Sequence, residues 1–551
     1  MRDLNASTIP APVRPTTILQ FGGGNFLRAF VDQMVQVAND AGVMNTGVAI
    51  VHATSHDDPA LDLLVAQDGR YHVLLEGIAN GEPVREFTLV NSITAIVRAH
   101  ANFAAYRDLY LSPDLTMIAS NTTEAGIAWV AGDDLTAQPP VSFPAKIAAL
   151  LFDRWQHFDG AADKGLRIVC CELIEDNGST LRQYVLRHAA AARLPAKFVT
   201  WVEQSCSFHD TLVDRIVPGY PHDEIDAIQT EIDFHDQVVV KGERFGIWAI
   251  ADASPAVVST RRSSLAPTQP PAHSGWLSRE RSDRVETTTV PPLRDLLPLD
   301  RAGLPVEFMT DIRPFRAKKV KILNGLHTAM AQVGLLAGCE SVREAVTHPA
   351  IASYLQCLLA DEILPSIPDY WAGDESRAEL VAFAAKITER FDNPFLHHRL
   401  ADISLNSISK WQARNLPVAL DCWKNSEDSP LTTFAFAALA VLYSGQGADS
   451  QAVRATGWEP RDDEAPLTAL RMPFDTADDS SIVAWIRHVI DAAGFFPDEA
   501  ELPPMDADLL WPVASERSDS PHASYLANTA ARHVRAILDH GIAAALTALT
   551  T

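Results

Sequence analysis

Residues 1–250 alternate short apolar runs with segments of helical periodicity, and this alternation constrains the fold more than any other feature of the chain. The runs are Thr17–Gln20, Gly47–Val51, Leu115–Ala119 and Leu166–Cys170. Short β-rich runs separated by helices favour a parallel sheet that is covered by helices on both faces. The sequence therefore predicts an α/β fold for this part of the chain.

The rest of the chain has a different pattern. From about Leu299 onward the periodicity is mostly helical, with alanine-rich stretches such as Phe434–Leu442. Residues 252–292 are crowded with Ser, Pro, Thr and Arg and have little apolar periodicity, which is typical of a flexible segment. We therefore expect an α/β domain over 1–251, a flexible insertion over 252–292 and a mostly helical domain over 293–551.

The first apolar run leads directly into a glycine-rich turn and then an amphipathic segment. Glycine allows a tight turn and lets the backbone approach a pyrophosphate, which the N-terminus of the following helix stabilises. A complete dinucleotide fingerprint would have its third glycine at position 27, which is leucine here, so a simple glycine turn remains the alternative. The residues expected to form the cofactor site of this Rossmann-like domain are Ile18, Leu19, Gln20, Phe21, Gly22, Gly23, Gly24, Asn25, Phe26, Leu27, Arg28 and Ala29.

Polar residues after the next apolar runs indicate which dinucleotide binds. The segment Val51–Asp58 has no Arg or Lys to bind the 2′-phosphate of NADP, and Asp57 or Asp58 could reach a ribose hydroxyl if the loop folds back. Asn121 follows the third run, where it could face ribose or nicotinamide, with an asparagine-capped turn as an equal alternative. The sequence favours NAD.

Near the middle of the chain, a segment of helical periodicity carries Lys319, Asn324 and His327. At about 100° per residue these side chains fall at roughly 0°, 140° and 80° around the helix. An apolar stripe is centred near the angle of Lys319; it consists of Leu323, Leu326, Met330 and Val333. Lys318 and Lys321 point roughly 100° and 160° away from Lys319.

Lys319 is therefore the lysine that we expect to enter a core or cleft. Burial disfavours the ammonium ion and lowers the pKa of a lysine toward the range that suits a general acid or base. The alternative has even weight: all three lysines are solvated and His327 is a core residue. An amine, an amide and an imidazole on one side of a helix can move a proton to or from a carbonyl without a metal.

A second amide follows the fourth apolar run. Asn177 precedes a glycine, and this pair usually marks a turn. If Asn177 instead points inward, it and Asn324 could both donate to one oxygen and stabilise negative charge there.

Composition excludes several classes of partner. The formal net charge of −25 makes nucleic acid or an anionic membrane an unsuitable partner. Six scattered cysteines with no CxxC pair favour a reducing compartment, and no apolar run is long enough to span a bilayer, so we expect a cytoplasmic protein. The HisxxxHis pair His52 and His56 lies in a loop rather than on a helix, so no metal site is expected.

Five motifs in the same order resemble the polyol-specific long-chain dehydrogenases, the mannitol dehydrogenase family. They cover residues 22–29, 120–127, 171–178, 211–218 and 319–328. The resemblance extends over nearly the whole chain, lapses across 252–292 and is weak beyond about residue 446. It implies an NAD-binding Rossmann domain and a helical catalytic domain.

The resemblance also implies a role for each candidate residue. Lys319 is the implied general acid/base, Asn177 and Asn324 polarise the carbonyl, and His327 orients the substrate. The implied reaction is NAD-dependent hydride transfer to a keto-sugar acid, with D-tagaturonate first among the substrates. Fructuronate, the polyols mannitol and arabinitol, and a non-catalytic NAD-binding sensor are the alternatives, and the oligomeric state stays open.

A sugar acid brings a carboxylate that needs a cation in the cleft. Lys410 and Arg414, at i and i+4 on one helical face, are candidates, as are the cations of 390–399. A solvated basic face is an equal alternative for each.

Overall fold

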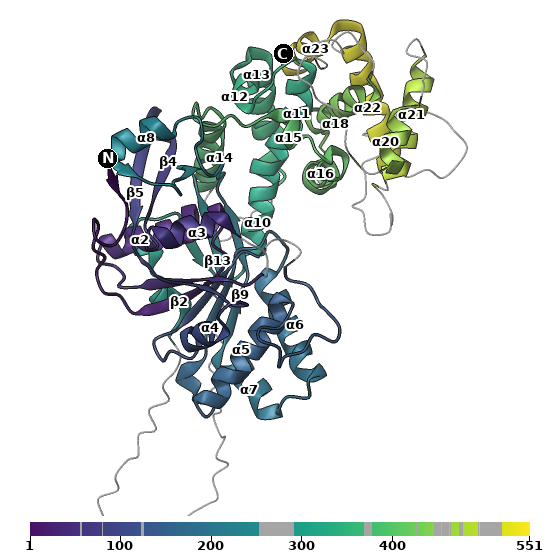
Figure 1. Cartoon of the computed structure of the whole chain (residues 1–551). Helices are drawn as coiled ribbons and strands as arrows, with labels where there is room; N and C mark the ends of the chain where they lie inside the picture. The colour runs from purple at the N-terminus through teal and green to yellow at the C-terminus, as the bar shows by residue number, and fades with distance from the viewer. Residues whose placement is uncertain are drawn as a thin grey trace, which may run out of the picture. The chain divides into compact units, whose positions relative to one another are not determined.

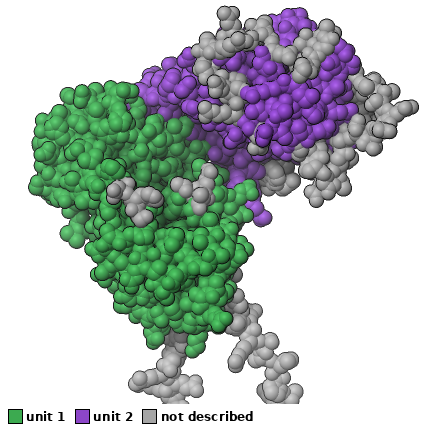
Figure 2. All heavy atoms as spheres, turned by 45° about the vertical axis from the view of Figure 1, so that its right-hand side comes forward, with its two compact units in different colours: residues 1–75, 85–312 green, residues 76–84, 313–551 purple. Residues whose placement is uncertain are grey.

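The computed structural model describes residues 1–54, 58–79, 81–122, 126–252, 291–367, 377–425, 427–445, 453, 462, 464–472, 478–493, 495 and 521–551. These residues form two compact units, the first made of 1–75 and 85–312 and the second of 76–84 and 313–551 (Figure 2). Most of the expected flexible insertion, 253–290, lies outside the described residues.

A six-stranded parallel sheet forms the centre of the first unit. In spatial order its strands are β6 (Ile93–Arg98), β3 (Gly47–His52), β2 (Thr16–Phe21), β7 (Met117–Ser120), β8 (Arg167–Cys170) and β9 (Ser207–His209). Counted along the chain within this sheet, the order is 3-2-1-4-5-6, the order of doubly wound dinucleotide-binding domains. The predicted parallel sheet is confirmed.

Both faces of this sheet are buried, because successive side chains of each strand enter different cores. Leu19 and Phe21 of β2 pack on the side of the core that contains side chains of α4, α5, α6 and α7. Ile18 packs in the other core, together with Phe30 and Met34 from the segment that follows the glycine turn. The bounds of the helices on the two sides are α4 (Phe103–Tyr110), α5 (Phe143–His157), α6 (Asn177–Ala191), α7 (Ala196–Ser205), α1 (Asn25–Leu27), η1 (Arg28–Asp32), α2 (Gln33–Asp40) and α3 (Pro59–Ala66) (Figure 1).

Smaller sheets lie mostly in the first unit. They are β12 (Val240–Glu243), β4 (Tyr71–Ala79) and β5 (Glu82–Val90); β10 (Thr211–Asp214), β13 (Ile247–Ala251) and β14 (Val306–Met309); and β1 (Arg2–Asp3) with β11 (Phe234–His235). The remaining short helices are η2 (Ala162–Lys164), α8 (Ile225–Ile232), α9 (Leu293–Leu296) and η3 (Leu299–Ala302). Because β14 pairs in parallel with β13, residues 293–312 belong to the first unit, and the expected boundary at 292/293 lies at 312/313 instead.

In its described part the second unit is helical over residues 313–551, and its segment 76–84 contributes the end of β4 and the start of β5. Its helices are α10 (Arg313–Lys319), η4 (Val320–Asn324), α11 (Gly325–Leu336), α12 (Val342–Thr347), α13 (Pro349–Cys357), η5 (Leu358–Ile363), α14 (Arg377–Phe391), α15 (Leu400–Ile403), α16 (Ser407–Arg414), α17 (Leu416–Lys424), α18 (Pro430–Ser444), α20 (Glu464–Leu470), α21 (Asp479–Ala493), α22 (Pro521–His540) and α23 (Ile542–Thr550). Helices α11 and α18 are buried on nearly every side and pack against each other. Among the described residues, no helix is both long enough and apolar enough to cross a bilayer.

A buried carboxyl group holds the start of α18. The two carboxyl oxygens of Glu362 accept hydrogen bonds from the backbone N–H groups of Leu431 and Thr432, each at 2.7 Å. The first-turn N–H groups of a helix lack partners within the helix, so this side chain satisfies two of them. Burial raises the pKa of Glu362 to about 7.

We predict that Glu362→Gln destabilises the protein by about 2 kcal/mol, because an amide NH₂ would face a backbone N–H at the start of α18. Chemical denaturation at pH 7 measures this loss. Glu340→Gln, the same substitution at an exposed position, is the control and should leave the free energy of unfolding nearly unchanged.

Candidate active site

The carboxyl ends of the parallel strands lie at one edge of the central sheet, and the glycine turn lies there. Gly22 follows β2 and has a φ of +114°, which L side chains rarely adopt. A Cβ at Gly22 would come within 3.2 Å of the backbone oxygen of Asn121, which follows β7. Strand order reverses between β2 and β7, and ligands of open α/β sheets bind at such a reversal.

The backbone at this turn fits the pyrophosphate of a dinucleotide. Gly24 precedes α1, and a Cβ built there would meet no atom within 4 Å. An open approach to a glycine-rich helix start is the arrangement that binds phosphates through backbone N–H groups. Of the twelve residues predicted for the cofactor site, only Gly22–Phe26 are accessible to a ligand. Ile18–Phe21, which lie in β2, and Leu27–Ala29 are buried.

Glu172 fixes the loop that carries Asn121. Its carboxyl oxygens accept hydrogen bonds from the Ser120 hydroxyl at 3.1 Å and from the Thr122 N–H and hydroxyl, both at 2.9 Å. The Asn121 side-chain amide donates to the Cys171 carbonyl at 2.7 Å. Burial raises the pKa of Glu172.

Asp58 has a structural partner, whereas Asp57 lies outside the described residues. The Asp58 carboxylate accepts a hydrogen bond from the Leu61 N–H at 3.1 Å and caps the start of α3. This is the usual role of aspartate at a helix N-cap. The expectation that one of the two reaches a ribose therefore rests on Asp57.

Asn177 is fully buried, and its amide group is committed to the backbone around it. The NH₂ group donates to the carbonyls of Cys170, Glu172 and Thr211 at 3.0, 3.0 and 3.3 Å. Its oxygen accepts from the Gly178 and Thr211 N–H groups at 2.9 Å each. Donation to a substrate oxygen would break this set, so the geometry gives Asn177 the role of a brace and not that of an oxyanion donor.

The helix that carries Lys319 is interrupted by a π turn, η4, between α10 and α11. A π turn contains an extra residue and changes the angular position of every later side chain. The simple wheel therefore assigned the lysines wrongly: Lys318 and Lys321 are each only 3% exposed, whereas Lys319 is partly exposed. The side chain of Lys319 is not the one that enters the core.

The two buried lysines have structural partners. The Lys321 ammonium donates to the Ser366 carbonyl at 2.8 Å and pairs with Asp421, while the Lys318 ammonium lies 4.7 Å from the Phe315 ring centroid. Burial lowers the pKa of Lys321. Lys319 is the partly exposed lysine of the three.

Positive groups surround His327. Its pKa is held well below the usual value, first by burial and then by the charges of Arg390, His398, Arg414 and Lys319. The rings of His327 and His398 lie 5.3 Å apart between centroids. The imidazole is therefore neutral at pH 7 and lies among cations, an environment that suits an anion.

Asn324 and His327 keep their polar atoms free for a ligand. Among the described residues, neither side chain forms a hydrogen bond, and both are partly exposed. His327 contacts the Phe391 ring, with 4.4 Å between centroids. An imidazole and an amide with unused donors and acceptors can orient a hydroxyl or carbonyl group.

Of the two cations proposed for a carboxylate, one reaches this group. An Arg414 guanidinium N–H donates to the Thr328 hydroxyl at 3.0 Å, next to His327. The Lys410 ammonium instead donates to the Ile403 carbonyl at 2.7 Å, and its charge is not among those acting on His327. Arg390, which is 8% exposed, is a third cation beside the imidazole.

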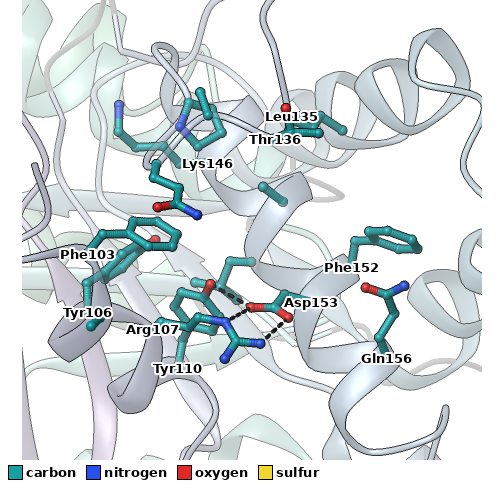
Figure 3. Close-up of a pocket in the computed structure, with 16 residues that line it drawn as sticks. Phe103, Tyr106, Arg107, Tyr110, Leu135, Thr136, Lys146, Phe152, Asp153 and Gln156 are labelled. Atoms are coloured by element: carbon teal, nitrogen blue, oxygen red, sulfur yellow. Dashed lines mark hydrogen bonds and ion pairs between the residues drawn. The ribbon is translucent and has the colours of Figure 1, made fainter.

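A separate pocket of about 620 Å³ lies between α4 and α5 and contains none of the predicted site residues (Figure 3). The Arg107 guanidinium makes a two-point ion pair with Asp153 at 2.6 and 2.7 Å, and Tyr110 donates to the same carboxylate at 2.9 Å. Lys146, also on its lining, donates to the Val141 carbonyl at 2.5 Å. The charges on its wall are paired with neighbouring protein groups.

The described residues contain no cluster of three or more His, Cys, Asp or Glu with the geometry of a metal site. His56 of the HisxxxHis pair lies outside them.

Comparison with known proteins agrees with this arrangement of two units. Residues 16–260 match the mannitol dehydrogenase Rossmann domain, and residues 311–486 match the mannitol dehydrogenase C-terminal domain. The chain belongs to the mannitol dehydrogenase family. It is an oxidoreductase that acts on a CH–OH group.

Two curated relatives are more than a third identical to this chain over the residues that align. An altronate oxidoreductase of Cronobacter sakazakii is 37% identical over 494 residues, 89% of this chain and 91% of that protein. An altronate oxidoreductase of Klebsiella pneumoniae is 38% identical over 448 residues, 81% of this chain and 83% of that protein.

Solved structures confirm the fold at lower sequence identity. A D-sorbitol dehydrogenase in substrate-free form aligns with a TM-score of 0.70 at 18% identity, over 97% of this chain and 95% of that chain. A mannitol 2-dehydrogenase of Pseudomonas fluorescens, in a ternary complex with NAD and D-mannitol, aligns with a TM-score of 0.60 at 18% identity, over 97% and 94%.

Sequence reasoning did not assign roles to Glu172 and His398, and it included Arg390 only among the candidate cations of 390–399. The acidic residue two positions after the end of β8 was a signal for Glu172, because that edge holds the ligand loops. Arg390 lies in a segment already marked as cationic. Nothing in the local sequence indicated which of its cations would face His327.

We predict that Asn177→Ala destabilises the protein far more than Asn324→Ala does. The first should destabilise the protein by about 3 kcal/mol, because it strips buried backbone groups of their partners. The second should change the free energy of unfolding by less than about 0.5 kcal/mol, because the Asn324 side-chain amide forms no hydrogen bond with any described residue. Denaturant titration followed by tryptophan fluorescence measures both, and a stable Asn177→Ala protein would contradict the bracing role.

Proposed function

We propose that this protein is an NAD-dependent tagaturonate reductase, also called altronate oxidoreductase, which interconverts D-tagaturonate and D-altronate. The names of its relatives, which cover most of the chain, support this substrate pair. The cationic group around His327 is the structural observation that carries the proposal, because a uronate is an anion and a polyol is not. Scattered cysteines, free among the described residues, support a reducing, cytoplasmic location.

Each unit supplies a different part of the chemistry. The accessible turn Gly22–Phe26 would hold the pyrophosphate of NAD, and the loop at Asn121 would lie beside the ribose or nicotinamide. When bound, NAD supplies or accepts the hydride. Metal ions are not needed by this scheme, because a lysine can move the proton.

The second unit handles the substrate oxygen. In the direction of reduction, Lys319 delivers a proton to the ketone oxygen as negative charge develops there. Asn324 donates a hydrogen bond to the same oxygen and stabilises that charge. His327, held neutral, orients the neighbouring hydroxyl. Asn177 acts indirectly, by fixing the backbone at the end of β8.

Arg414 and Arg390 are the cations that we assign to the substrate carboxylate, in place of the pair Lys410 and Arg414. Both act on His327 and are partly or fully buried, so their charges are less screened than those of surface residues. Guanidinium groups bind carboxylates through two parallel hydrogen bonds. Fructuronate, the epimeric keto acid, is the second candidate substrate because it carries the same carboxylate.

We predict that Lys319→Ala lowers kcat for NADH-dependent reduction of tagaturonate by about 10²-fold to 10⁴-fold, the usual contribution of a general acid. Lys424→Ala, at an exposed lysine of α17, is the control and should leave kcat unchanged. Activity within a few fold of wild type in the Lys319 variant would reject its role. Absence of turnover in the wild type with tagaturonate, fructuronate and fructose would instead favour a non-catalytic sensor.

We predict that Arg414→Gln raises KM for the keto acid by about 10-fold to 100-fold, because a charge-assisted hydrogen bond to the carboxylate is lost. Lys410→Gln, one turn earlier on α16, should change KM only slightly. Equal effects of the two substitutions, or an equal effect of Arg414→Gln on a neutral ketose such as fructose, would contradict the assignment.

A further inference from the structure

A chain of buried polar side chains lies directly behind the glycine turn. The Gln20 amide NH₂ donates to the Gly22 carbonyl at 3.1 Å and to the Asp32 carboxyl oxygen Oδ2 at 3.2 Å. The Tyr71 hydroxyl lies 3.1 Å from the same Oδ2 and 3.1 Å from the Arg28 carbonyl. Gln20, Asp32 and Tyr71 have no exposed surface, so bulk water does not reach these contacts.

Counting protons along this chain links the state of Asp32 to the direction in which Tyr71 donates. The NH₂ group of Gln20 has two protons, and both are used. The Tyr71 hydroxyl has one proton but two oxygen neighbours at hydrogen-bonding distance, and the Arg28 carbonyl can only accept. If Tyr71 donates to Arg28, the contact between Tyr71 and Asp32 is a hydrogen bond only when Asp32 carries the proton.

The environment of Asp32 also favours the neutral acid. Within the described part of the chain, its other oxygen, Oδ1, is buried without a hydrogen-bond partner. An ionised carboxylate with an unpartnered buried oxygen is costly, whereas a neutral acid is less so. Burial raises the pKa of Asp32 to about 7, against smaller opposing effects of Gln20, Tyr71 and the Arg28 guanidinium.

Other charged groups lie around this chain and belong to different elements. Asp236, between β11 and β12, acts on both Arg28 and Tyr71, and Asp58, before α3, acts on Arg28. Burial lowers the pKa of Arg28 and raises that of Tyr71 well above its usual value. Tyr71 therefore keeps its proton at any pH near neutrality, and Asp32 is the group of the hydrogen-bonded chain that titrates there.

We propose that Asp32 is a positioning residue, held as a neutral carboxylic acid, that fixes the Gly22 turn for dinucleotide binding through Gln20; this role rests on the cofactor site proposed above. The proton of Asp32 links two parts of the fold. On one side, Gln20 ties the acid to the turn. On the other, Tyr71 of β4 ties it to the Arg28 carbonyl in η1.

Loss of the proton rearranges this link. An ionised Asp32 needs a donor, so the Tyr71 proton turns from the Arg28 carbonyl to the carboxylate. The carbonyl is then left without that partner inside the segment that directly follows the turn. Because the neutral form is the one that supports the turn, affinity for NADH should fall as pH rises through about 7.

Equilibrium binding of NADH to the full-length protein, followed by fluorescence, tests this inference without turnover. In the wild type, Kd should rise by about fivefold between pH of about 6 and 8, the loss expected for one rearranged hydrogen bond. In Asp32→Asn, which cannot titrate, Kd should not depend on pH in this range. A pH-independent wild-type Kd, or the same dependence in the variant, would overturn the inference, whereas absence of NADH binding at every pH would overturn the proposed cofactor.

A second substitution keeps the test decisive if Asp32→Asn fails to fold. Tyr71→Phe removes only the hydroxyl group and should raise Kd at the lower pH to about the wild-type value at the higher pH. The matched control is Tyr106→Phe on α4, whose buried hydroxyl makes no hydrogen bond in the described part of the chain. Tyr71→Phe binding equal to that of the control would contradict the link.

Infrared spectroscopy of the wild type observes the proton directly. The C=O stretch of a buried protonated carboxylic acid should disappear as pH is raised through about 7. Glu362 titrates in the same range, so the comparison is made in the Glu362→Gln background. The band should be weaker in the Asp32→Asn, Glu362→Gln double variant than in Glu362→Gln alone. Equal bands in these two proteins would show that the proton belongs to another group.

Discussion

The contact between the turn after β2 and the loop after β7 is the constraint on which the site depends. Strand order reverses at this point, so the two connections leave the sheet in different directions and open a space between them. Gly22 is required there because a side chain would press on the Asn121 backbone. Glu172 holds the second loop, and Asn177 holds the end of β8. Rigid strands and buried hydrogen bonds thus fix the backbone that a dinucleotide would approach, and the accessible residues are few.

Charge is distributed unevenly between the surface and the interior of this protein. The chain carries a net charge of −25, yet the cations Arg390, Arg414 and Lys319 act on His327. Such a local group attracts an anion only because the field is concentrated where water is scarce. The same burial keeps the imidazole of His327 neutral and raises the pKa of buried carboxyl groups such as Glu362 and Glu172. Desolvation, more than pairing of opposite charges, therefore sets the protonation of the functional and structural groups alike.

The sequence allowed the fold class and the cofactor edge to be predicted, because strand runs and the glycine turn are local patterns. The position of the domain boundary was harder to predict from the sequence, because β14 joins the first unit by pairing with β13, which is distant in sequence. The prediction of which lysine is buried was wrong because η4 contains an extra residue, which shifts the apolar stripe relative to Lys319. No hydrophobic pattern in the sequence revealed this π turn. Asn177 was recognised as important, but its partners Cys170 and Thr211 are brought to it by the tertiary fold. The roles of Arg390 and Asp32 depend on burial and on neighbours that are far away in sequence.

The π turn in the helix of Lys319 has a consequence for how this helix tolerates change. A continuous α-helix repeats its directions every few residues, so shortening it by one residue rotates everything downstream by about 100°. In this helix the wide turn separates Lys319 from Asn324 and His327, and the angle between them is set by one surplus residue. Point substitutions leave that angle intact, whereas loss of a single residue between 320 and 324 would turn the amine away from the amide and the imidazole. The length of this helix, as much as its composition, is therefore under constraint.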